Sequence, residues 1–150
     1  YPGRAGELEM LNRQQHQHPL DRIGKVLDVP ELLAAQADIR QVLVDHSVAD
    51  YVVSIVEATR SHPDVHLGAS PRGSLALFNA STAAAALNGR SFVIPDDVNS
   101  LAISTLAHRL IVTPSARVRN TDSRAIIADI VRSLPVPGSR PNPADARTGH

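Results

Sequence analysis

Apolar residues recur along much of the chain at the spacing that one face of an α-helix requires. The clearest stripe has the i, i+3, i+4, i+7 pattern of a buried face and consists of Val48, Tyr51, Val52, Ile55, Val56 and Thr59. Ser47 is expected to cap this helix, and Asp50 three residues later completes a capping box. The pattern predicts a helix from Ser47 to the stop at His62-Pro63-Asp64.

Five further helices are predicted from similar spacing and from end signals. They are expected at 7–17, at 31–40, from Ser70-Pro71 to the Asn88-Gly89 stop, from Pro95 to Arg109, and after the Thr121-Asp122 cap. The alanine-rich helix after Ser70 is apolar nearly all round, because Leu75, Leu77, Phe78 and Leu87 accompany its alanines. This composition predicts that the helix lies centrally, against several neighbours.

Short β-branched runs interrupt the helical pattern. The run from Val26 to Val29 and the run from Val42 to Val44 are expected to pair as a minor ribbon, and Leu110 to Thr113 reads as a brief extended segment. The sequence therefore predicts a mostly α fold, a small helical bundle of about five to six helices with at most short edge strands.

The chain changes character at Pro135. Four prolines and two glycines in a polar setting cannot bury enough surface to offset the entropy of ordering, so residues 135–150 are predicted to be a disordered tail after one domain at 1–134. The sequence opens at Tyr1 with no initiating methionine, and we expect it to come from a longer polypeptide with an upstream region.

Composition excludes several classes of function. Fourteen arginines and one lysine balance fifteen acids, so the long-range attraction that steers proteins to nucleic acid is absent. There is no cysteine, which excludes disulfides, zinc–thiolate sites and thiol nucleophiles. No apolar run approaches the roughly 20 residues that span a bilayer. These features predict a cytoplasmic protein with no nucleic-acid partner and no membrane span.

The chain lacks the motifs of a complete nucleotide hydrolase. A phosphate loop needs G-x-x-x-x-G-K-[ST], but the only lysine, Lys25, has Pro19 at the first glycine position and is followed by Val26. Asp96-Asp97 follows a proline and fits a helix start better than a metal site. We therefore predict no catalytic residue in this chain and no activity for the chain alone.

The histidines do not predict a metal site. His62 and His66 are four residues apart, but Pro63 disfavours a continuous helix through both, and no third ligand is placed near them. His16 and His18 stand in a polar run. We interpret all four as solvated loop histidines.

One segment conflicts with the usual electrostatics of helices. Gly68-Ala69-Ser70-Pro71-Arg72-Gly73 places an arginine in the first turn of a helix, where a cation is disfavoured by about 0.3–1 kcal/mol. A phosphate bound by Arg72 and the free N–H groups of the helix would offset that cost. The alternative is that Arg72 extends into solvent or pairs with an aspartate.

The segment from Gly68 to Arg72 resembles the second-sensor motif of MoxR-like AAA+ ATPases, in which the arginine reaches from the lid to the γ-phosphate. The flanks agree with that family's lid in order and spacing over residues 1–134. They are Tyr1-Pro2, Tyr51, Thr59-Arg60, the alanine-rich helix, Gly89-Arg90, Val93, Pro95, Asp97-Val98 and His108-Arg109. Gly73 departs from the pattern, since alanine is expected there, and weakens the helix start by up to about 1 kcal/mol.

The resemblance implies a nucleotide-sensing lid, in which Arg72 is the sensor and Gly68, Ser70 and Pro71 support its helix start. ATP, Mg²⁺ and the phosphate loop would then belong to an upstream ATPase domain of the full-length protein. The family forms homo-oligomeric rings, commonly hexamers, remodels or matures protein complexes, and often works beside von Willebrand factor A-domain proteins. A second hypothesis, a helical docking module that never contacts nucleotide, predicts a broad apolar patch and no role for Arg72.

Overall fold

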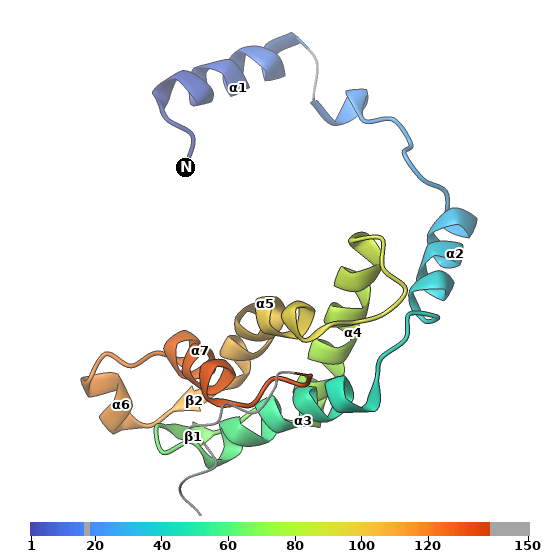
Figure 1. The fold of residues 1–150 in the computed structure, drawn as a ribbon. Helices are drawn as coiled ribbons and strands as arrows, with labels where there is room; N and C mark the ends of the chain where they lie inside the picture. Colours follow the sequence, from blue (N-terminus) through green and yellow to red (C-terminus); the bar gives the residue numbers. More distant parts are fainter. Residues whose placement is uncertain (17–18, 139–150) are drawn as a thin grey trace, which may run out of the picture. The chain divides into compact units, whose positions relative to one another are not determined.

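The computed structural model describes residues 1–16 and 19–138, and the chain divides into two compact units, 1–36 and 37–150 (Figure 1). Most of the predicted tail, residues 139–150, lies outside the described residues. Of the tail's first residues, Val136 is partly buried against the core of the second unit.

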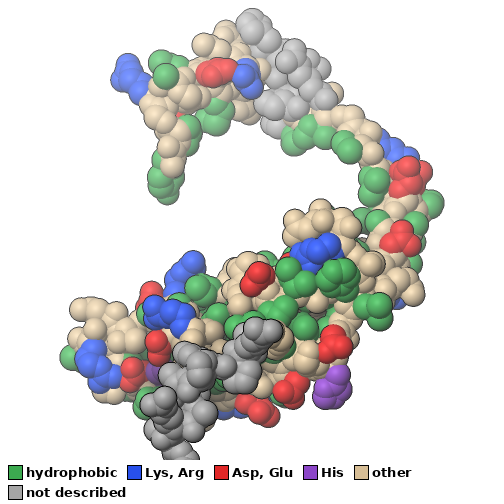
Figure 2. Space-filling model, viewed as in Figure 1, with side chains coloured by type: hydrophobic (Ala, Val, Ile, Leu, Met, Phe, Trp, Pro, Cys, Tyr) green, Lys and Arg blue, Asp and Glu red, His purple; other side chains and the backbone are tan. Residues whose placement is uncertain are grey.

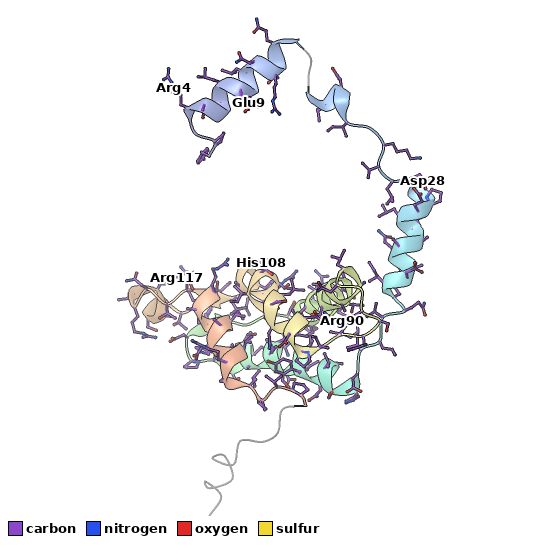
Figure 3. All side chains as sticks on the ribbon, turned by 45° about the horizontal axis from the view of Figure 1, so that its top comes forward. Arg4, Glu9, Asp28, Arg90, His108 and Arg117 are labelled. Atoms are coloured by element: carbon purple, nitrogen blue, oxygen red, sulfur yellow. The ribbon has the colours of Figure 1, made fainter. Side chains whose placement is uncertain are left out.

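The first unit contains α1 (Arg4–His16), the 3-10 helix η1 (Pro19–Arg22) and most of α2 (Val29–Ile39). Asp28 and Glu31 cap α2 reciprocally, because each side chain accepts a hydrogen bond from the other's backbone N–H, at 2.9 and 2.8 Å (Asp28 is labelled in Figure 3). None of α2's residues is buried. The prediction of a strand at Val26 to Val29 is wrong, since Val29 begins a helix.

The second unit is a helical bundle. Its helices are α3 (His46–Ser61), α4 (Pro71–Leu87), α5 (Pro95–Leu106) with the 3-10 turn η2 (Ala107–Arg109), α6 (Pro114–Val118) and α7 (Ser123–Ser133). The core contains the predicted stripes of α3, α5 and α7, and its fully buried side chains include Ile55, Leu77, Leu106, Ile126 and Ile127. The mostly α fold is confirmed.

The central position belongs to α5 and not to α4. Contacts join α5 to α3, α4 and α7, and Figure 1 shows α5 between α4 and α7. One face of α4 is exposed, because Leu75 and Leu87 are 63% and 87% exposed. Alanine is a small residue that tolerates solvent, so an alanine-rich helix can read as apolar all round and still bury only one side.

The two strands pair in a way that the sequence did not predict. The antiparallel pair is β1 (Val65–Leu67) with β2 (Ile111–Val112), and β2 lies in the expected 110–113 segment. Leu43 does not pair with the run at Val26; it forms a parallel bridge with Phe92. The predicted ribbon is therefore wrong, because pairing of short runs depends on packing far away in sequence.

The ends of α3 and α4 show how local chemistry sets helix boundaries. Asp45, and not Ser47, caps α3, since the Asp45 carboxylate accepts the Ser47 N–H at 2.9 Å. At the end of α4, Gly89 has a φ of +70°, which permits the Arg90 N–H to reach the Ala85 carbonyl at 2.9 Å. No helix in the described part of the chain is both long and apolar enough to cross a membrane.

Candidate functional site

The Gly68–Gly73 segment connects β1 to α4 and runs beside the last turn of α3. Ser70 precedes α4 in an extended conformation and Pro71 is its first residue, as the sequence predicts. The Ser70 side chain makes no capping hydrogen bond; its carbonyl accepts the Gly73 N–H at 2.7 Å. The start of α4 is therefore not held by its own cap.

The last turn of α3 holds the segment instead. The Ala69 N–H donates to Thr59 Oγ1 at 2.9 Å, and Arg60 Nε donates to the Ala69 carbonyl at 2.9 Å. Thr59 is fully buried, and its hydroxyl donates to the Val56 carbonyl at 2.6 Å. Two consecutive side chains of α3 thus satisfy both backbone polar groups of one residue.

Two glycines permit this close approach. A Cβ on Gly68 would lie 2.7 Å from Arg60 Cα, which is closer than nonbonded carbon atoms can be. A Cβ on Gly73 would lie 3.1 Å from Ala69 Cβ and 3.2 Å from a methyl group of Leu106. Gly73, where the family resemblance leads us to expect alanine, is therefore suited to tight packing between the start of α4 and the end of α5.

Three arginines surround the segment without an acidic partner. Arg72 is exposed in the first turn of α4, which contains no acid. Arg60 lies against Gly68, and the Cδ of Arg109 is 3.8 Å from the position of a Cβ on Gly73. None of the three forms an ion pair with any residue that the structure describes. Positive charge is thus concentrated at one helix start in a chain of zero net charge.

The start of α5 has the opposite electrostatics. Arg90, in the loop after α4 (Figure 3), forms a two-pronged ion pair with the buried Asp97, with Nη1 and Oδ2 2.7 Å apart. Asp97 also accepts the Ile94 N–H at 3.0 Å. The hydrogen bond from Arg90 holds the pKa of Asp97 below its ordinary value. The partners of the Asp97 carboxylate all belong to this chain, so Asp97 has a structural role.

The helix α7 also begins with a cation but compensates for it. Arg124 is the second residue of α7, the same position that Arg72 has in α4, and it is exposed. Directly before the helix, the Asp122 carboxylate accepts the Ala125 N–H at 2.8 Å and supplies negative charge to the helix end. Arg72 has no such neighbour, so α4 alone among these three starts lacks an anion.

The described residues offer no obvious metal site. No group of three or more His, Asp or Glu side chains able to hold a metal lies among them. His62 Nδ1 accepts the Asp64 N–H at 3.1 Å, and His66 lies exposed in β1. The side chains of His16 and His18 lie outside the described residues.

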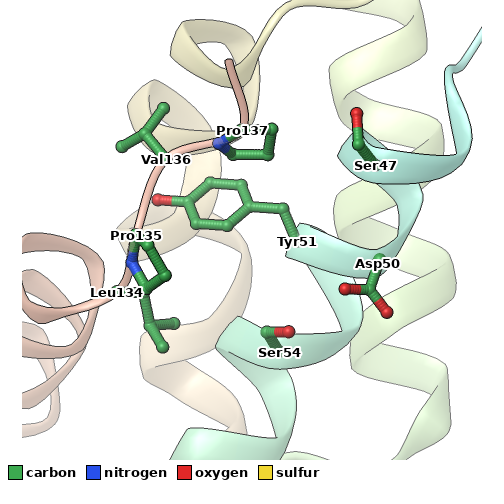
Figure 4. Close-up of a pocket in the computed structure, with 8 residues that line it drawn as sticks. All are labelled: Ser47, Asp50, Tyr51, Ser54, Leu134, Pro135, Val136 and Pro137. Atoms are coloured by element: carbon green, nitrogen blue, oxygen red, sulfur yellow. The ribbon is translucent and has the colours of Figure 1, made fainter. Parts of the chain in front are cut away.

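An open pocket of about 370 Å³ lies at the other end of α3 (Figure 4). Its lining comes from the first half of α3 and from the segment after α7, and comprises Ser47, Asp50, Tyr51, Ser54, Leu134, Pro135, Val136 and Pro137. The Tyr51 hydroxyl donates to Asn99 at 2.8 Å, and burial raises its pKa. Because Tyr51 and Arg60 are nine positions apart on α3, about 13 Å along the helix, this pocket is not part of the candidate Arg72 site.

The contacts of Thr59 and Arg60 with Ala69 do not follow from the pattern of the sequence. One signal was available: Thr59 is a polar residue in a stripe of valines, isoleucines and a tyrosine. A threonine at a fully buried position needs a hydrogen-bond partner, and Ala69 supplies the partner for its lone pair. Nothing in the sequence indicated that Arg109 would lie beside Gly73.

Comparison with known proteins adds the family. Residues 57–130 match the AAA lid domain. The chain is 39% identical to the uncharacterized protein YeaC of Bacillus subtilis over 93% of its length, and 31% identical to the chaperone MoxR1 of Mycobacterium tuberculosis over 91%. It spans 44% and 38% of those two proteins, less than half of each.

A solved structure has the same fold. The crystal structure of a "putative ATPase" from Cytophaga hutchinsonii superposes with a TM-score of 0.79 and 26% sequence identity, over 91% of this chain and 44% of that one. The helical bundle, the AAA lid match and the MoxR relatives agree with one another. The chain belongs to the lid domains of the MoxR-like AAA+ ATPases.

Proposed function

We propose that this lid senses nucleotide through Arg72, which contacts the γ-phosphate of ATP bound by the rest of the polypeptide. The observation that carries the proposal is the uncompensated cation at the start of α4: Arg72 is exposed, its helix has no acid in the first turn, and Ser70 leaves the helix end uncapped by a side chain. A phosphate would supply the missing anion at a helix end that favours one.

The neighbouring arginines support the proposal. Arg60 and Arg109 flank the same segment and form no ion pair with any described residue, so neither brings an acidic partner to this helix start. A guanidinium gives charge-assisted hydrogen bonds to phosphate oxygens. Because Arg72 gains this partner only when a γ-phosphate is present, ATP and ADP would favour different lid positions.

The rest of the machinery would come from outside this chain. When bound, ATP with Mg²⁺ supplies a phosphoanhydride bond whose hydrolysis releases the γ-phosphate. The lid's residues would bind and orient that phosphate, while the upstream ATPase domain would hold the metal. The chaperone name of one relative supports chaperone-like remodelling of protein complexes. The ring of subunits and the von Willebrand factor A-domain partner are proposed from the family resemblance alone.

The first unit carries surface suited to that upstream domain. Its apolar side chains are exposed on α1, on α2 and between them, and in Figure 2 they are seen along both helices. They include Leu8, Leu11, Ile23, Val26 and Leu33, which are between 51% and 93% exposed. Apolar surface on this scale stabilises a protein only when a partner covers it.

Protein docking is a second candidate function, and one observation favours it. Leu43 and Phe92 lie opposite each other in a parallel bridge, and they are 71% and 51% exposed. Figure 2 shows apolar side chains reaching the surface over α4 and α5. Phe92 follows the C-terminal end of α4 and Arg72 stands at the N-terminal end of that helix, so docking and sensing would use different surfaces.

Steady-state ATP hydrolysis by the full-length protein tests the proposal. Arg72→Met is expected to lower turnover at least about tenfold, or roughly 1.4 kcal/mol in transition-state stabilisation, while the protein stays folded and assembled. Arg124→Met is the matched control, since it removes an exposed arginine from the same position of α7, and it should leave turnover unchanged. Unchanged turnover in Arg72→Met would leave docking as the function of this domain.

A further inference from the structure

Two side chains of α3 form hydrogen bonds with the backbone N–H and the backbone carbonyl of Ala69. Ala69 is 1% exposed, and it lies three residues before Arg72. Its N–H donates to Thr59 Oγ1 and its carbonyl accepts from Arg60 Nε, both at 2.9 Å. Fixing the donor and the acceptor of one residue fixes the orientation of the backbone that leads directly into α4.

The Thr59 hydroxyl is itself held in one orientation. It donates to the Val56 carbonyl at 2.6 Å, so a lone pair is left for the Ala69 N–H. Valine has nearly the same shape and would fill this fully buried position in an aliphatic stripe. Packing alone therefore does not account for a threonine here, whereas its hydroxyl connects α3 to the segment that begins α4.

The geometry leaves little freedom around this contact. Gly68 passes so close to Arg60 that a Cβ would lie 2.7 Å from its Cα and 2.8 Å from its Cγ. The Ser70 side chain makes no bond that would hold the start of α4 independently. The direction in which α4 begins, and hence the position of Arg72, depends on the two contacts from α3.

We propose that Thr59 and Arg60 are positioning residues that aim Arg72 at the γ-phosphate. The proposal rests on the sensing function proposed above. Neither residue needs to contact nucleotide: Thr59 is buried, and Arg60 acts through the Ala69 carbonyl. Loss of either contact would let the start of α4 shift, and displacements near 1 Å at a positioned group can cost about a hundredfold in rate.

The test is steady-state ATP hydrolysis by the full-length protein. Thr59→Val is expected to lower kcat about tenfold, within the range that misplacement of a positioned group produces, and Thr59→Ser should restore it because serine keeps the Oγ. Thr82→Val is the matched control: Thr82 is also buried in a helix, but its hydroxyl donates only to the Phe78 carbonyl of its own helix, at 2.8 Å.

A second pair of variants covers the case in which Thr59→Val fails to fold. Arg60→Met removes the donor to Ala69 from an exposed side chain, and Arg60→Lys retains a donor. Arg60→Met is expected to lower kcat and Arg60→Lys to recover part of the loss. Arg132→Met, in the last turn of α7, is the control, since Arg132 pairs only with Asp129 of its own helix.

The double variants separate positioning from a merely structural role. In an Arg72→Met background, Thr59→Val and Arg60→Met should cause no further loss of kcat, because the group that they position is gone. Wild-type turnover in both folded single variants, or the same loss with and without Arg72, would overturn the positioning role. Wild-type turnover in Arg72→Met itself would overturn the sensing function and the positioning role together.

Discussion

The helices α4 and α5 begin with nearly the same backbone, but they differ in the charged groups at their first turns. Each has a proline as its first residue, preceded by a residue with extended backbone, Ser70 in one and Ile94 in the other. At α5 the acid Asp97, the cation Arg90 and the Ile94 N–H satisfy one another. At α4 an arginine faces a helix end without an acid.

The difference separates a structural ion pair at α5 from the proposed phosphate-binding site at α4. The α5 start is electrostatically complete within the chain, so it needs nothing from outside. The α4 start is held mechanically by α3 but leaves its charge unbalanced, which is unfavourable for the isolated lid and favourable once a phosphate arrives. If the proposed sensing function holds, the lid accepts a small cost in stability at the place where it would meet nucleotide.

The largest expected effect is loss of the completed pair at α5. Asp97→Asn removes the charge from a side chain that is 6% exposed and bonded to Arg90, and should lower the free energy of unfolding by about 2–3 kcal/mol. Asp96→Asn changes the exposed neighbour and is the matched control. Urea denaturation of the 150-residue chain measures both, and equal effects would show that Asp97 has no special structural role.

The next effect concerns the close approach at α4. Gly68→Ala forces a Cβ to within 2.7 Å of the Arg60 backbone and should cost about 1–3 kcal/mol, the usual range for overpacking. Gly24→Ala meets nothing within 4 Å and should change stability by less than about 1 kcal/mol. Thermal unfolding of the two variants gives the comparison, and a fully stable Gly68→Ala would contradict the tight contact.

Acid titration should reveal how much the ion pair between Arg90 and Asp97 stabilises the fold. Because Arg90 lowers the pKa of Asp97, the unfolded chain takes up a proton at a pH where the folded chain still excludes it. The stabilisation is present above the ordinary aspartate pKa of about 4 and is lost as the pH falls through the lowered value. Unfolding free energies measured across this range should fall less steeply for Asp97→Asn than for the parent, and identical slopes would refute the pairing.

The smallest expected effect is a gain in stability. Arg72→Glu gives α4 the kind of first turn that α5 has, and should stabilise the chain by about 0.3–1 kcal/mol. Arg124→Glu should gain less, because Asp122 already supplies an anion at the start of α7. Denaturation curves at low salt would detect the difference, and destabilisation by Arg72→Glu would mean that Arg72 has a partner within the chain.

The sequence predicted those features of the fold that depend on residues close together in the chain. The stripe on α3, the proline starts of α4 and α5 and the Asp122 cap of α7 are local patterns, and the structure contains all of them. The pairing of Leu43 with Phe92 and of β1 with β2 could not be read in this way, since partners distant in sequence are chosen by packing. The five-residue α6 was too short to give a periodic signal.

The candidate site likewise has a local part, which the sequence predicted, and a non-local part, which it did not. The mismatch of Arg72 with a helix start is local and was visible in the sequence. The contacts around it are not local: Thr59 and Arg60 lie on the preceding helix, and Arg109 approaches Gly73 from η2. Spacing along the chain contains no information on which of these residues meet.

The proposed sensing function requires that Arg72 distinguishes nucleotides with a γ-phosphate from those without one. The direct measurement is calorimetric binding of a non-hydrolysable ATP analogue and of ADP to the full-length protein, for the parent and for Arg72→Met. The variant should lose at least about fivefold in affinity for the analogue, at the low end of typical couplings, and none for ADP. Equal loss for both nucleotides, or no loss for either, would contradict it.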